Sequence, residues 1–329
     1  MPHVLVAGAI HEAGLALLRA APGVTLDVVE AVSTESYAPL VGRADAVLIR
    51  TQPMPAAVID EAPRLAFVSR HGVGFDAVDV AALNRRSIPL AIVGDVNSQP
   101  VAEHAMMLIL ALAKRALVLD AATRQAGWAR RNGFEAFELA GKALLLVGFG
   151  RIGRRVAGMA EAFGMRVLVH DPFVGAAAIR AAGAEPAAAL DAALGEADIV
   201  SLHVPLGGDG VLIGAPELKR MKPTAILVNT ARGGLVDEAA LAAALAEGGL
   251  AGAGLDVFAG EPPPADHPLL GSDRVVLSPH SASLTRECAA RMSVAAAQNI
   301  LDFFAGRLDP ALVVNAASLP PAGRRQMQA

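Results

Sequence analysis

Three stretches of the sequence place a polar side chain directly after a short apolar run, where a strand is expected to end. AILVNTARGG carries Arg232, GLDVFAGEPP carries Asp256 and Glu261, and VVLSPHSAS carries His280. Histidine exchanges a proton near neutral pH, a carboxylate beside it orients the imidazole, and arginine holds carboxylate or carbonyl oxygens. The set indicates proton transfer on a small anionic substrate. Taken singly, each residue could instead be a surface charge, a loop acid or a structural histidine.

A glycine-rich turn supplies a second chemical signal. The apolar run ALLLV leads into GFGRIG, residues 148–153, and a helical pattern follows. Gly148 permits a tight turn, Gly150 allows backbone amides to approach a pyrophosphate, and Gly153 allows close packing of helix on strand. Asp171 ends the next strand, where an acid binds a ribose diol and repels a 2′-phosphate, which predicts NAD rather than NADP. The alternative is an ordinary strand–helix turn with an exposed aspartate.

The cofactor turn and the proton-transfer set together predict hydride transfer at a 2-hydroxy acid. Removing a hydride from an alcohol requires a base for the hydroxyl proton, and the reverse reaction requires an acid; His280 can serve as both. In an open parallel sheet, ligands bind beyond the carboxyl ends of the strands. We therefore expect these residues to meet at that edge of a sheet.

Composition excludes several classes of function. The chain has 329 residues, 54% hydrophobic and 18% charged, which is enough for the cores of two domains. Its net charge of −4, with no cluster of lysines and arginines, argues against nucleic-acid or membrane partners. The single Cys288, the absence of a signal-peptide pattern and the short apolar run AMMLILALA predict a soluble cytoplasmic protein. No histidine pair has HxxxH spacing and there is no cysteine pair, so we expect no metal site.

Short apolar runs alternate with helical segments along most of the chain, as in βαβ units. One series runs from HVLVAG to IPLAIVG, and a second runs from ALLLVGFG to RVVLSPH. We predict an α/β fold with two Rossmann-like or flavodoxin-like parallel-sheet domains, connected by a long helix over residues 101–119. The last helix, RECAARMSVAAAQNILDFFAG, follows the second series and could return to the first domain.

The motifs resemble those of the D-isomer-specific 2-hydroxyacid dehydrogenases, over roughly residues 45–305. They are HGVGFDAVD, VAEHAMMLILALAKR, GKALLLVGFGRIGRRVA, LHVPL, NTARGGLVDEAALAAAL, GLDVFAGEPP, HPLL and SPHSA. The resemblance implies a discontinuous substrate-binding domain, residues 1–98 and 288–329, and an NAD-binding Rossmann domain, residues 99–287. It also implies a homodimer formed through the NAD domain, with the segment around Trp128 as the dimer-contact arm.

The resemblance also assigns residues by position. Arg232 matches the substrate-binding catalytic arginine, Glu261 the acid paired with the histidine, and His280 the acid–base residue. The backbone amides of Val73 and Gly74 match a pair that binds a substrate carboxylate. The matches to cofactor contacts are Gly148, Gly150, Arg151, Ile152, Gly153, Asp171, Val204, Pro205, Thr230, Ala231 and Asp256.

Substrate choice would fall to the first domain, where Arg50 and Arg70 each stand at the end of a strand. Our hypothesis is that they recognise a polar or second anionic group on the substrate; the alternative is that they form salt bridges. We expect interconversion of a D-2-hydroxy acid and its 2-oxo acid, led by glycerate and hydroxypyruvate or a phosphorylated or other dianionic relative. Two alternatives stay open: a dehydrogenase of the same architecture acting on phosphite or formate, and a non-enzymatic NAD-sensing protein resembling corepressors.

Overall fold

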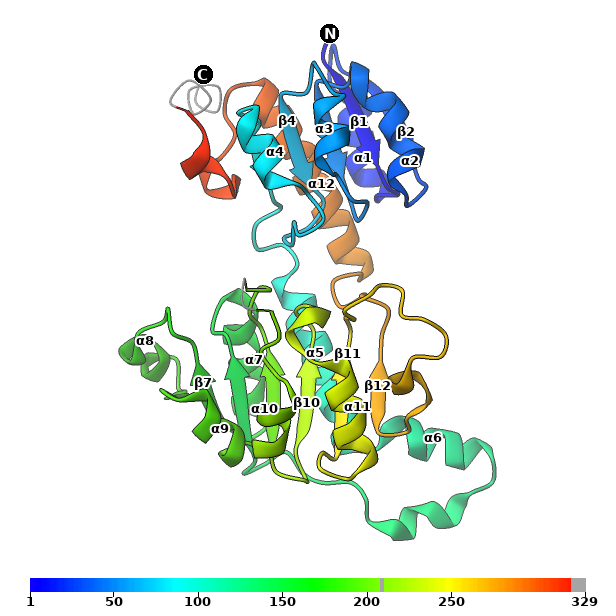
Figure 1. The fold of residues 1–329 in the computed structure, drawn as a ribbon, viewed down its shortest axis with the longest axis vertical. Coiled ribbons are helices and arrows are strands. Elements are labelled where there is room, and N and C mark those ends of the chain that lie inside the picture. The colour runs from blue at the N-terminus through cyan, green and yellow to red at the C-terminus, as the bar shows by residue number, and fades with distance from the viewer. Residues whose placement is uncertain (208–209, 321–329) are drawn as a thin grey trace. The chain divides into compact units, whose positions relative to one another are not determined.

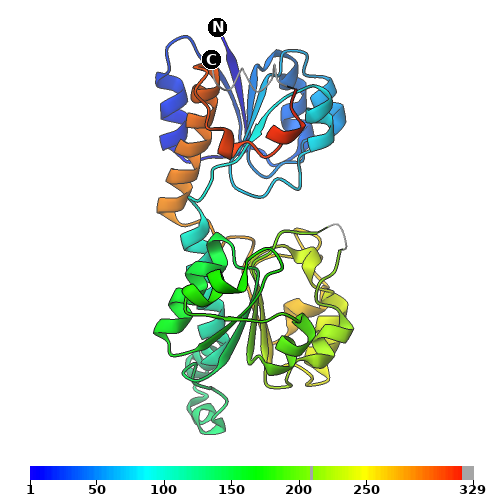
Figure 2. The ribbon, with the colours of Figure 1, turned by 90° about the vertical axis from the view of Figure 1, so that its left-hand side faces the viewer.

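The computed structural model describes residues 1–207 and 210–320 and divides the chain into two compact units. The first unit holds Met1–Asn97 and Leu284–Ala329, and the second holds Ser98–Ser283. Each unit contains one parallel sheet with helices on both faces (Figure 1 and Figure 2). The predicted fold class, two parallel-sheet α/β domains of which one is discontinuous, is confirmed.

The first unit has a five-stranded parallel sheet in the order β2-β1-β3-β4-β5, the flavodoxin-like order. The middle strand of the sheet, Ala46–Ile49, is continuously apolar because helices cover both of its faces. The strands are β1 (His3–Ala7), β2 (Thr25–Val29), β3 (Ala46–Ile49), β4 (Phe67–Arg70) and β5 (Leu90–Ala91). The helices are α1 (Glu12–Ala20), α2 (Thr34–Tyr37), α3 (Ala56–Asp60), α4 (Val80–Arg85) and α12 (Arg286–Phe304).

Helix α12 joins the first unit through its apolar face. The ring of Phe303 stacks on that of Phe67 in β4, with centroids 4.5 Å apart. The hydroxyl of Ser69, also in β4, donates to the carbonyl of Ala296 at 2.9 Å. These contacts explain why the C-terminal helix belongs with the first sheet although it follows the second in sequence.

The second unit has a seven-stranded parallel sheet in the order β12-β11-β10-β9-β6-β7-β8. Chain order reverses between β6 and β9, and such a switch point is where doubly wound sheets bind nucleotides. The strands are β6 (Ala143–Val147), β7 (Arg166–His170), β8 (Glu185–Pro186), β9 (Ile199–Leu202), β10 (Ile226–Asn229), β11 (Gly252–Leu255) and β12 (Val275–Leu277). The helices that cover the sheet are α5 (Ser98–Ala113), α7 (Arg151–Ala162), α8 (Ala176–Ala181), α9 (Leu190–Glu196), α10 (Ala215–Arg220) and α11 (Glu238–Ala246).

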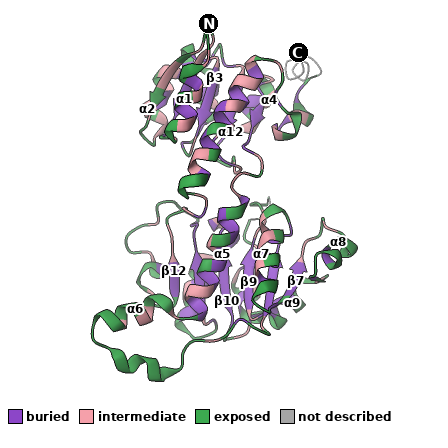
Figure 3. Cartoon of the chain, turned by 180° about the vertical axis from the view of Figure 1, so that it is seen from behind, coloured by how far each residue is buried: buried purple, intermediate pink, exposed green. Residues whose placement is uncertain are grey.

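The prediction of one long helix over residues 101–119 is wrong. This segment belongs to two helices, α5 and α6 (Ala116–Arg124). Arg115 lies between them with φ of 52°, a left-handed conformation that cannot continue a right-handed helix. Its guanidinium lies 3.3 Å from the Glu135 carboxylate. Helix α5 buries ten residues, whereas α6 buries none and is mostly exposed (Figure 3). Across the described ranges, no helix has both the length and the apolar character needed to cross a membrane.

One buried polar contact inside the first unit is sensitive to pH. His71 follows β4, and its Nε2 lies 2.9 Å from Ser293 Oγ in α12. That hydroxyl donates its only proton to the carbonyl of Ala289, so Nε2 must carry a proton and donate to Ser293. Burial, with the nearby charges of Arg70 and Arg50, lowers the pKa of His71 to about 4.

We expect His71 to make the first unit less stable in acid. The pKa of His71 is lower in the folded state than in the unfolded state. Its contribution to the free energy of unfolding is therefore complete above about pH 6.5 and is lost as pH falls toward 4. Lowering the pH from 7 to 5 should reduce the free energy of unfolding by about 2 kcal/mol through this residue. Hydrogen exchange of β1, β3 and β4 measures this loss, and His71→Gln should reduce it. An equal loss in the variant and the wild-type protein would contradict the assignment.

Candidate active site

The glycine-rich turn between β6 and α7 has the geometry of an anion site. Gly148 has φ of +99°, and a Cβ on Gly153 would lie 2.3 Å from the carbonyl oxygen of Gly148, so neither position admits a side chain. A Cβ on Gly150 would meet nothing within 4 Å, which leaves open space beside the turn. Gly150 caps α7 without a side-chain hydrogen bond. The first amides of α7, from Arg151 and Ile152 onward, therefore remain available to a phosphate.

Asp171 stands directly after β7 and faces this turn. Its Oδ2 accepts a hydrogen bond from the amide of Phe149 at 2.8 Å, and its Oδ1 accepts one from Phe173 at 2.8 Å. These bonds fix the carboxylate beside the glycines. Each oxygen keeps a second lone pair that can accept another hydrogen bond. Such a carboxylate can accept hydrogen bonds from a ribose diol.

The segments after β9 and β10 line the same edge of the sheet. Val204 and Pro205 follow β9, and Val204 Cγ1 would lie 2.8 Å from a Cβ on Gly148. Thr230 and Ala231 follow β10. Thr230 Oγ1 is buried and has no hydrogen-bond partner among the residues that the structure describes. An orphaned hydroxyl at the same sheet edge as the open glycine turn fits a bound dinucleotide that would satisfy it.

The contact of the site that bears on proton transfer joins His280 and Glu261. His280 Nδ1 lies 2.7 Å from Glu261 Oε2, and Glu261 Oε1 accepts the amide proton of Phe258 at 3.0 Å. Both side chains are accessible to solvent. Because Glu261 engages Nδ1, Nε2 is the nitrogen left for a substrate proton.

The loop that carries His280 is held by Asp256, which is 1% exposed. His280 has φ of 50°, and its amide donates to the carbonyl of Asp256 at 2.7 Å. The Asp256 carboxylate accepts hydrogen bonds from the Ser278 hydroxyl at 2.6 Å and from the amides of Ser281 and Ala282 at 2.8 and 2.9 Å. Asp256, which the sequence assigned to the cofactor, thus binds the histidine loop with both oxygens.

His104 of α5 extends this network. Its Nε2 lies 2.7 Å from Ser278 Oγ, whose single proton goes to Asp256, so His104 must donate. Sequence analysis assigned no chemical role to His104 or Ser278. The SPH motif identified His280 as a candidate. The spacing of residues along the sequence does not show which side chains contact the His280 loop.

Arg232 stands in the turn after β10, which a buried asparagine closes. Asn229 Nδ2 donates to the carbonyl of Arg232 at 2.8 Å, and Asn229 Oδ1 accepts the amide proton of Ala231 at 3.0 Å. Arg232 Nη1 donates to the carbonyl of Ala231 at 2.6 Å. A Cβ on Gly233 would lie 1.8 Å from the carbonyl carbon of Phe258, so the turns that lead to Arg232 and to Glu261 pack directly together. Sequence reasoning missed Asn229, although it lies inside the NTARGG motif.

The remaining predicted residues lie in the first unit and form a group of their own. Arg50 follows β3, and Arg70 ends β4, the strand beside it. Arg70 Nη1 donates to the carbonyl of His71 at 2.6 Å, just before the turn that contains Val73 and Gly74. The charges of both arginines act on His71, which places two positive groups at the carboxyl edge of this sheet.

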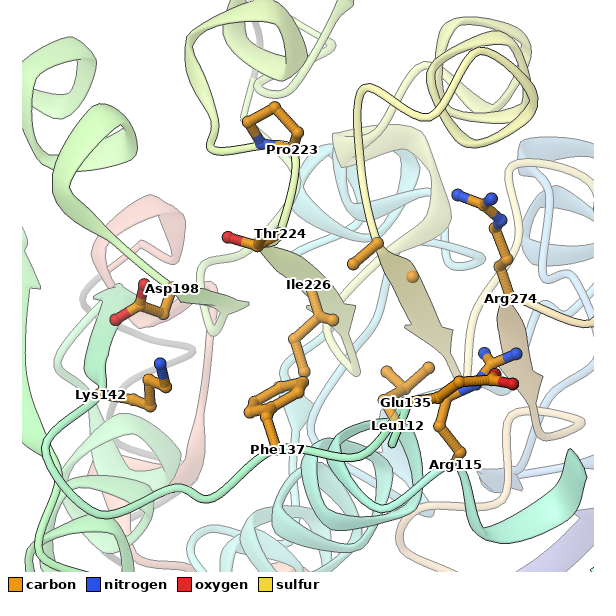
Figure 4. A pocket seen from close by; sticks show the side chains of 12 residues that line it. Leu112, Arg115, Glu135, Phe137, Lys142, Asp198, Pro223, Thr224, Ile226 and Arg274 are labelled. Atoms are coloured by element: carbon orange, nitrogen blue, oxygen red, sulfur yellow. The ribbon is translucent and has the colours of Figure 1, made fainter. Parts of the chain in front are cut away.

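A cavity of about 530 Å³ lies at the opposite edge of the second sheet, beside the amino ends of β10 and β11 (Figure 4). Leu112, Phe137 and Ile226 form its apolar wall, and Arg115 and Glu135 lie at one side. None of the predicted site residues lines it. The cavity is therefore separate from the candidate active site.

Comparison with known proteins agrees with this geometry. The family model described as D-isomer specific 2-hydroxyacid dehydrogenase, NAD binding domain, matches residues 106–282. A glyoxylate reductase of Korarchaeum cryptofilum is 41% identical over 271 residues, 81% of this chain and 81% of that protein. A D-3-phosphoglycerate dehydrogenase of Archaeoglobus fulgidus is 36% identical over 321 residues, 97% of this chain and 60% of the relative. The structure of an Aquifex aeolicus D-lactate dehydrogenase complexed with NAD and lactic acid has a TM-score of 0.86 at 26% identity, covering 94% of this chain and 98% of that one.

The chain belongs to the D-isomer specific 2-hydroxyacid dehydrogenases. It is an NAD-dependent oxidoreductase of this class, and the predictions of family, enzyme class and NAD as cofactor are confirmed. The glycine turn, Asp171 and the orphaned Thr230 hydroxyl are the features of this chain that fit the cofactor.

Thr230→Val should separate stability from cofactor binding. Removing a buried hydroxyl without a partner should raise the free energy of unfolding of the cofactor-free protein by about 1 kcal/mol. Loss of the hydrogen bond to the cofactor should weaken NADH binding about tenfold. Urea unfolding and NADH fluorescence titration measure the two quantities. Thr224→Val, an exposed threonine just before the same strand, is the control; an unchanged NADH Kd in Thr230→Val would contradict the assignment.

Proposed function

We propose that this dehydrogenase interconverts a D-2-hydroxy acid and its 2-oxo acid, with His280 as the acid–base residue. The observation that carries the proposal is the 2.7 Å contact between His280 Nδ1 and Glu261 Oε2, which leaves Nε2 for the substrate. Arg232 supplies a guanidinium to the substrate carboxylate or carbonyl. The backbone amides of Val73 and Gly74 bind the carboxylate. In this account the first unit is the substrate-binding domain.

In this mechanism His280 transfers the proton, whereas Glu261 and Arg232 stabilise charge. The glycine turn and Asp171 would hold NAD, which would supply the hydride acceptor for the substrate C2 or, as NADH, the hydride donor. In the oxidising direction His280 Nε2 takes the hydroxyl proton, and Glu261 stabilises the imidazolium that forms. Arg232 forms charge-assisted hydrogen bonds with the substrate through its guanidinium. In the reducing direction the imidazolium returns the proton to the carbonyl oxygen.

The test is NADH oxidation with a panel of 2-oxo acids: glyoxylate, hydroxypyruvate, phosphohydroxypyruvate, pyruvate, oxaloacetate and sulfopyruvate. We expect turnover of at least one, and His280→Gln should lower kcat about 100- to 10,000-fold with NADH binding unchanged. His3→Gln, in β1, is the control and should keep wild-type kcat.

Other outcomes would contradict the proposal. Reduction of NAD by phosphite or formate alone would assign a different substrate to the same architecture. Tight NADH binding with no turnover on any substrate would favour an NAD-sensing protein. Full activity in His280→Gln would remove the histidine from the mechanism.

We further propose that the preferred substrate carries a polar or second anionic group beyond its 2-oxo acid, as in hydroxypyruvate or a phosphorylated relative. Support comes from Arg50 and Arg70, which stand at adjacent strand ends and whose charges add to burial in lowering the pKa of His71. Relatives named glyoxylate reductase and D-3-phosphoglycerate dehydrogenase represent the two possibilities, a small substrate and a dianionic one.

Arg50→Ala and Arg70→Ala should therefore raise KM selectively. For hydroxypyruvate or phosphohydroxypyruvate we expect an increase of about tenfold or more, because a charge-assisted hydrogen bond contributes about 1.5–3 kcal/mol. KM for glyoxylate, which has no further group, should change much less. Arg64→Ala, which breaks the exposed pair with Asp45 in the same unit, is the control. Unchanged KM values for every acid would rule out substrate recognition by these arginines.

We also propose a homodimer formed through the NAD-binding unit. Residues 116–136 form an arm in which neither α6 nor the short helix Trp128–Gly133 buries any residue. Trp128 is 67% exposed and Phe134 is 88% exposed, so this one arm presents two large aromatic side chains to solvent. A second copy of the chain would cover them.

The free, buried Cys288 is compatible with a cytoplasmic location, which we propose as well.

The molar mass in solution tests the dimer. Light scattering should give twice the 33.6 kDa chain mass for the wild-type protein. Trp128→Ala combined with Phe134→Ala should weaken association at least about tenfold, because buried aromatic side chains dominate such interfaces. Phe173→Ala, an exposed phenylalanine outside the arm, should leave the mass unchanged. A monomeric wild-type protein would contradict the proposal.

A further inference from the structure

Glu238, the first residue of α11, does not cap its own helix. The preceding Asp237 performs that role, since its carboxylate accepts the amide proton of Ala240 at 3.0 Å. Glu238 instead reaches the loop that follows β11. Its Oε1 accepts the amide proton of Ala259, and its Oε2 lies 3.0 Å from His267 Nε2. The Glu238 and His267 side chains are only 14% and 13% exposed, so water competes little for this contact.

His267 is itself held in one orientation. Its Nδ1 accepts the amide proton of Leu269, so its Nε2 carries the proton that goes to Glu238. Its ring meets the edge of Phe258 with centroids 5.7 Å apart. The histidine is therefore a fixed donor, and Glu238 is the acceptor that joins it to Ala259.

The two partners of Glu238 are the two ends of one loop. Residues 259–267 lie between them, and this loop contains Glu261. Nearly all of the loop is exposed, so it has little apolar burial of its own to hold it in place. Three prolines, Pro262 to Pro264, limit its freedom but donate no hydrogen bond. One carboxylate outside the loop thus closes its base.

We propose that Glu238, together with His267, is a positioning residue that holds Glu261 against His280. The inference rests on the proposed function, in which the Glu261–His280 pair transfers the proton. Glu238 touches neither the pair nor the glycine turn in any contact of the described structure, so it acts through the loop alone. Its loss would leave cofactor binding intact and would allow Glu261 to leave the 2.7 Å contact with His280.

A double-mutant cycle tests whether Glu238 acts through Glu261. In the wild-type background, Glu238→Ala should lower kcat about 10- to 100-fold, since misplacing a catalytic group can cost about 100-fold. NADH Kd should stay within about twofold. In a Glu261→Ala background, the same substitution should change kcat by less than about twofold, because there is no carboxylate left to position. His267→Gln, which keeps a donor for Glu238, should restore most of the activity that His267→Ala loses.

Glu217→Ala is the matched control. Glu217 also accepts a backbone amide proton, from Gly214 at 3.0 Å, but it does so in α10, away from the loop. It should leave kcat unchanged in both backgrounds. Equal losses of kcat from Glu238→Ala in the two backgrounds, or no loss in the wild-type background, would overturn the inference. Absence of turnover in the wild-type enzyme would instead overturn the proposed function.

Discussion

Where a parallel strand ends, the backbone that follows it has no neighbouring strand with which to form hydrogen bonds. This constraint governs the carboxyl edge of the sheet in the second unit. Loops at the carboxyl edge leave amides and carbonyls that no neighbouring strand satisfies. In this chain, polar side chains at two strand ends and at the start of α11 satisfy them. Asn229 closes the turn after β10, Asp256 holds the loop after β12, and Glu238 closes the loop after β11.

These three polar side chains explain how loops can hold a geometry that proton transfer requires. Arg232, Glu261 and His280 each stand on a different loop, and each loop is bound by a polar residue outside the reacting set. Asp256, which is as deeply buried as Asn229, holds His280 in a left-handed backbone conformation. Such conformations persist only where surrounding contacts determine them, and they are common at functional sites. The site is thus built from a rigid sheet edge and polar contacts rather than from apolar packing.

Much of this arrangement could be predicted from the sequence, because its signals are local. Alternating apolar runs and helical segments predicted both sheets, and the GFGRIG turn with Asp171 predicted the cofactor. Arg232, Glu261 and His280 were found because each follows an apolar run. The division of the helix at Arg115 was not predicted, since its left-handed backbone is stabilised by a long-range pair with Glu135.

The residues that hold the loops were harder to find. Glu238 contacts Ala259 and His267, and His104 contacts Ser278, across separations that periodicity does not report. An acid at the start of a helix is also expected from helix electrostatics alone, which hides the role of Glu238. The sequence therefore predicts which residues could react, whereas only the fold shows which residues position them.

The central claim is that Glu261 fixes His280 with its proton on Nδ1, leaving Nε2 as the base. Nitrogen-15 NMR of histidine-labelled enzyme measures this directly, with the His280 signals assigned by their loss in His280→Gln. The account predicts that neutral His280 is protonated at Nδ1, and that Glu261→Gln abolishes this preference. A neutral imidazole protonated at Nε2 in the wild-type enzyme would contradict the account.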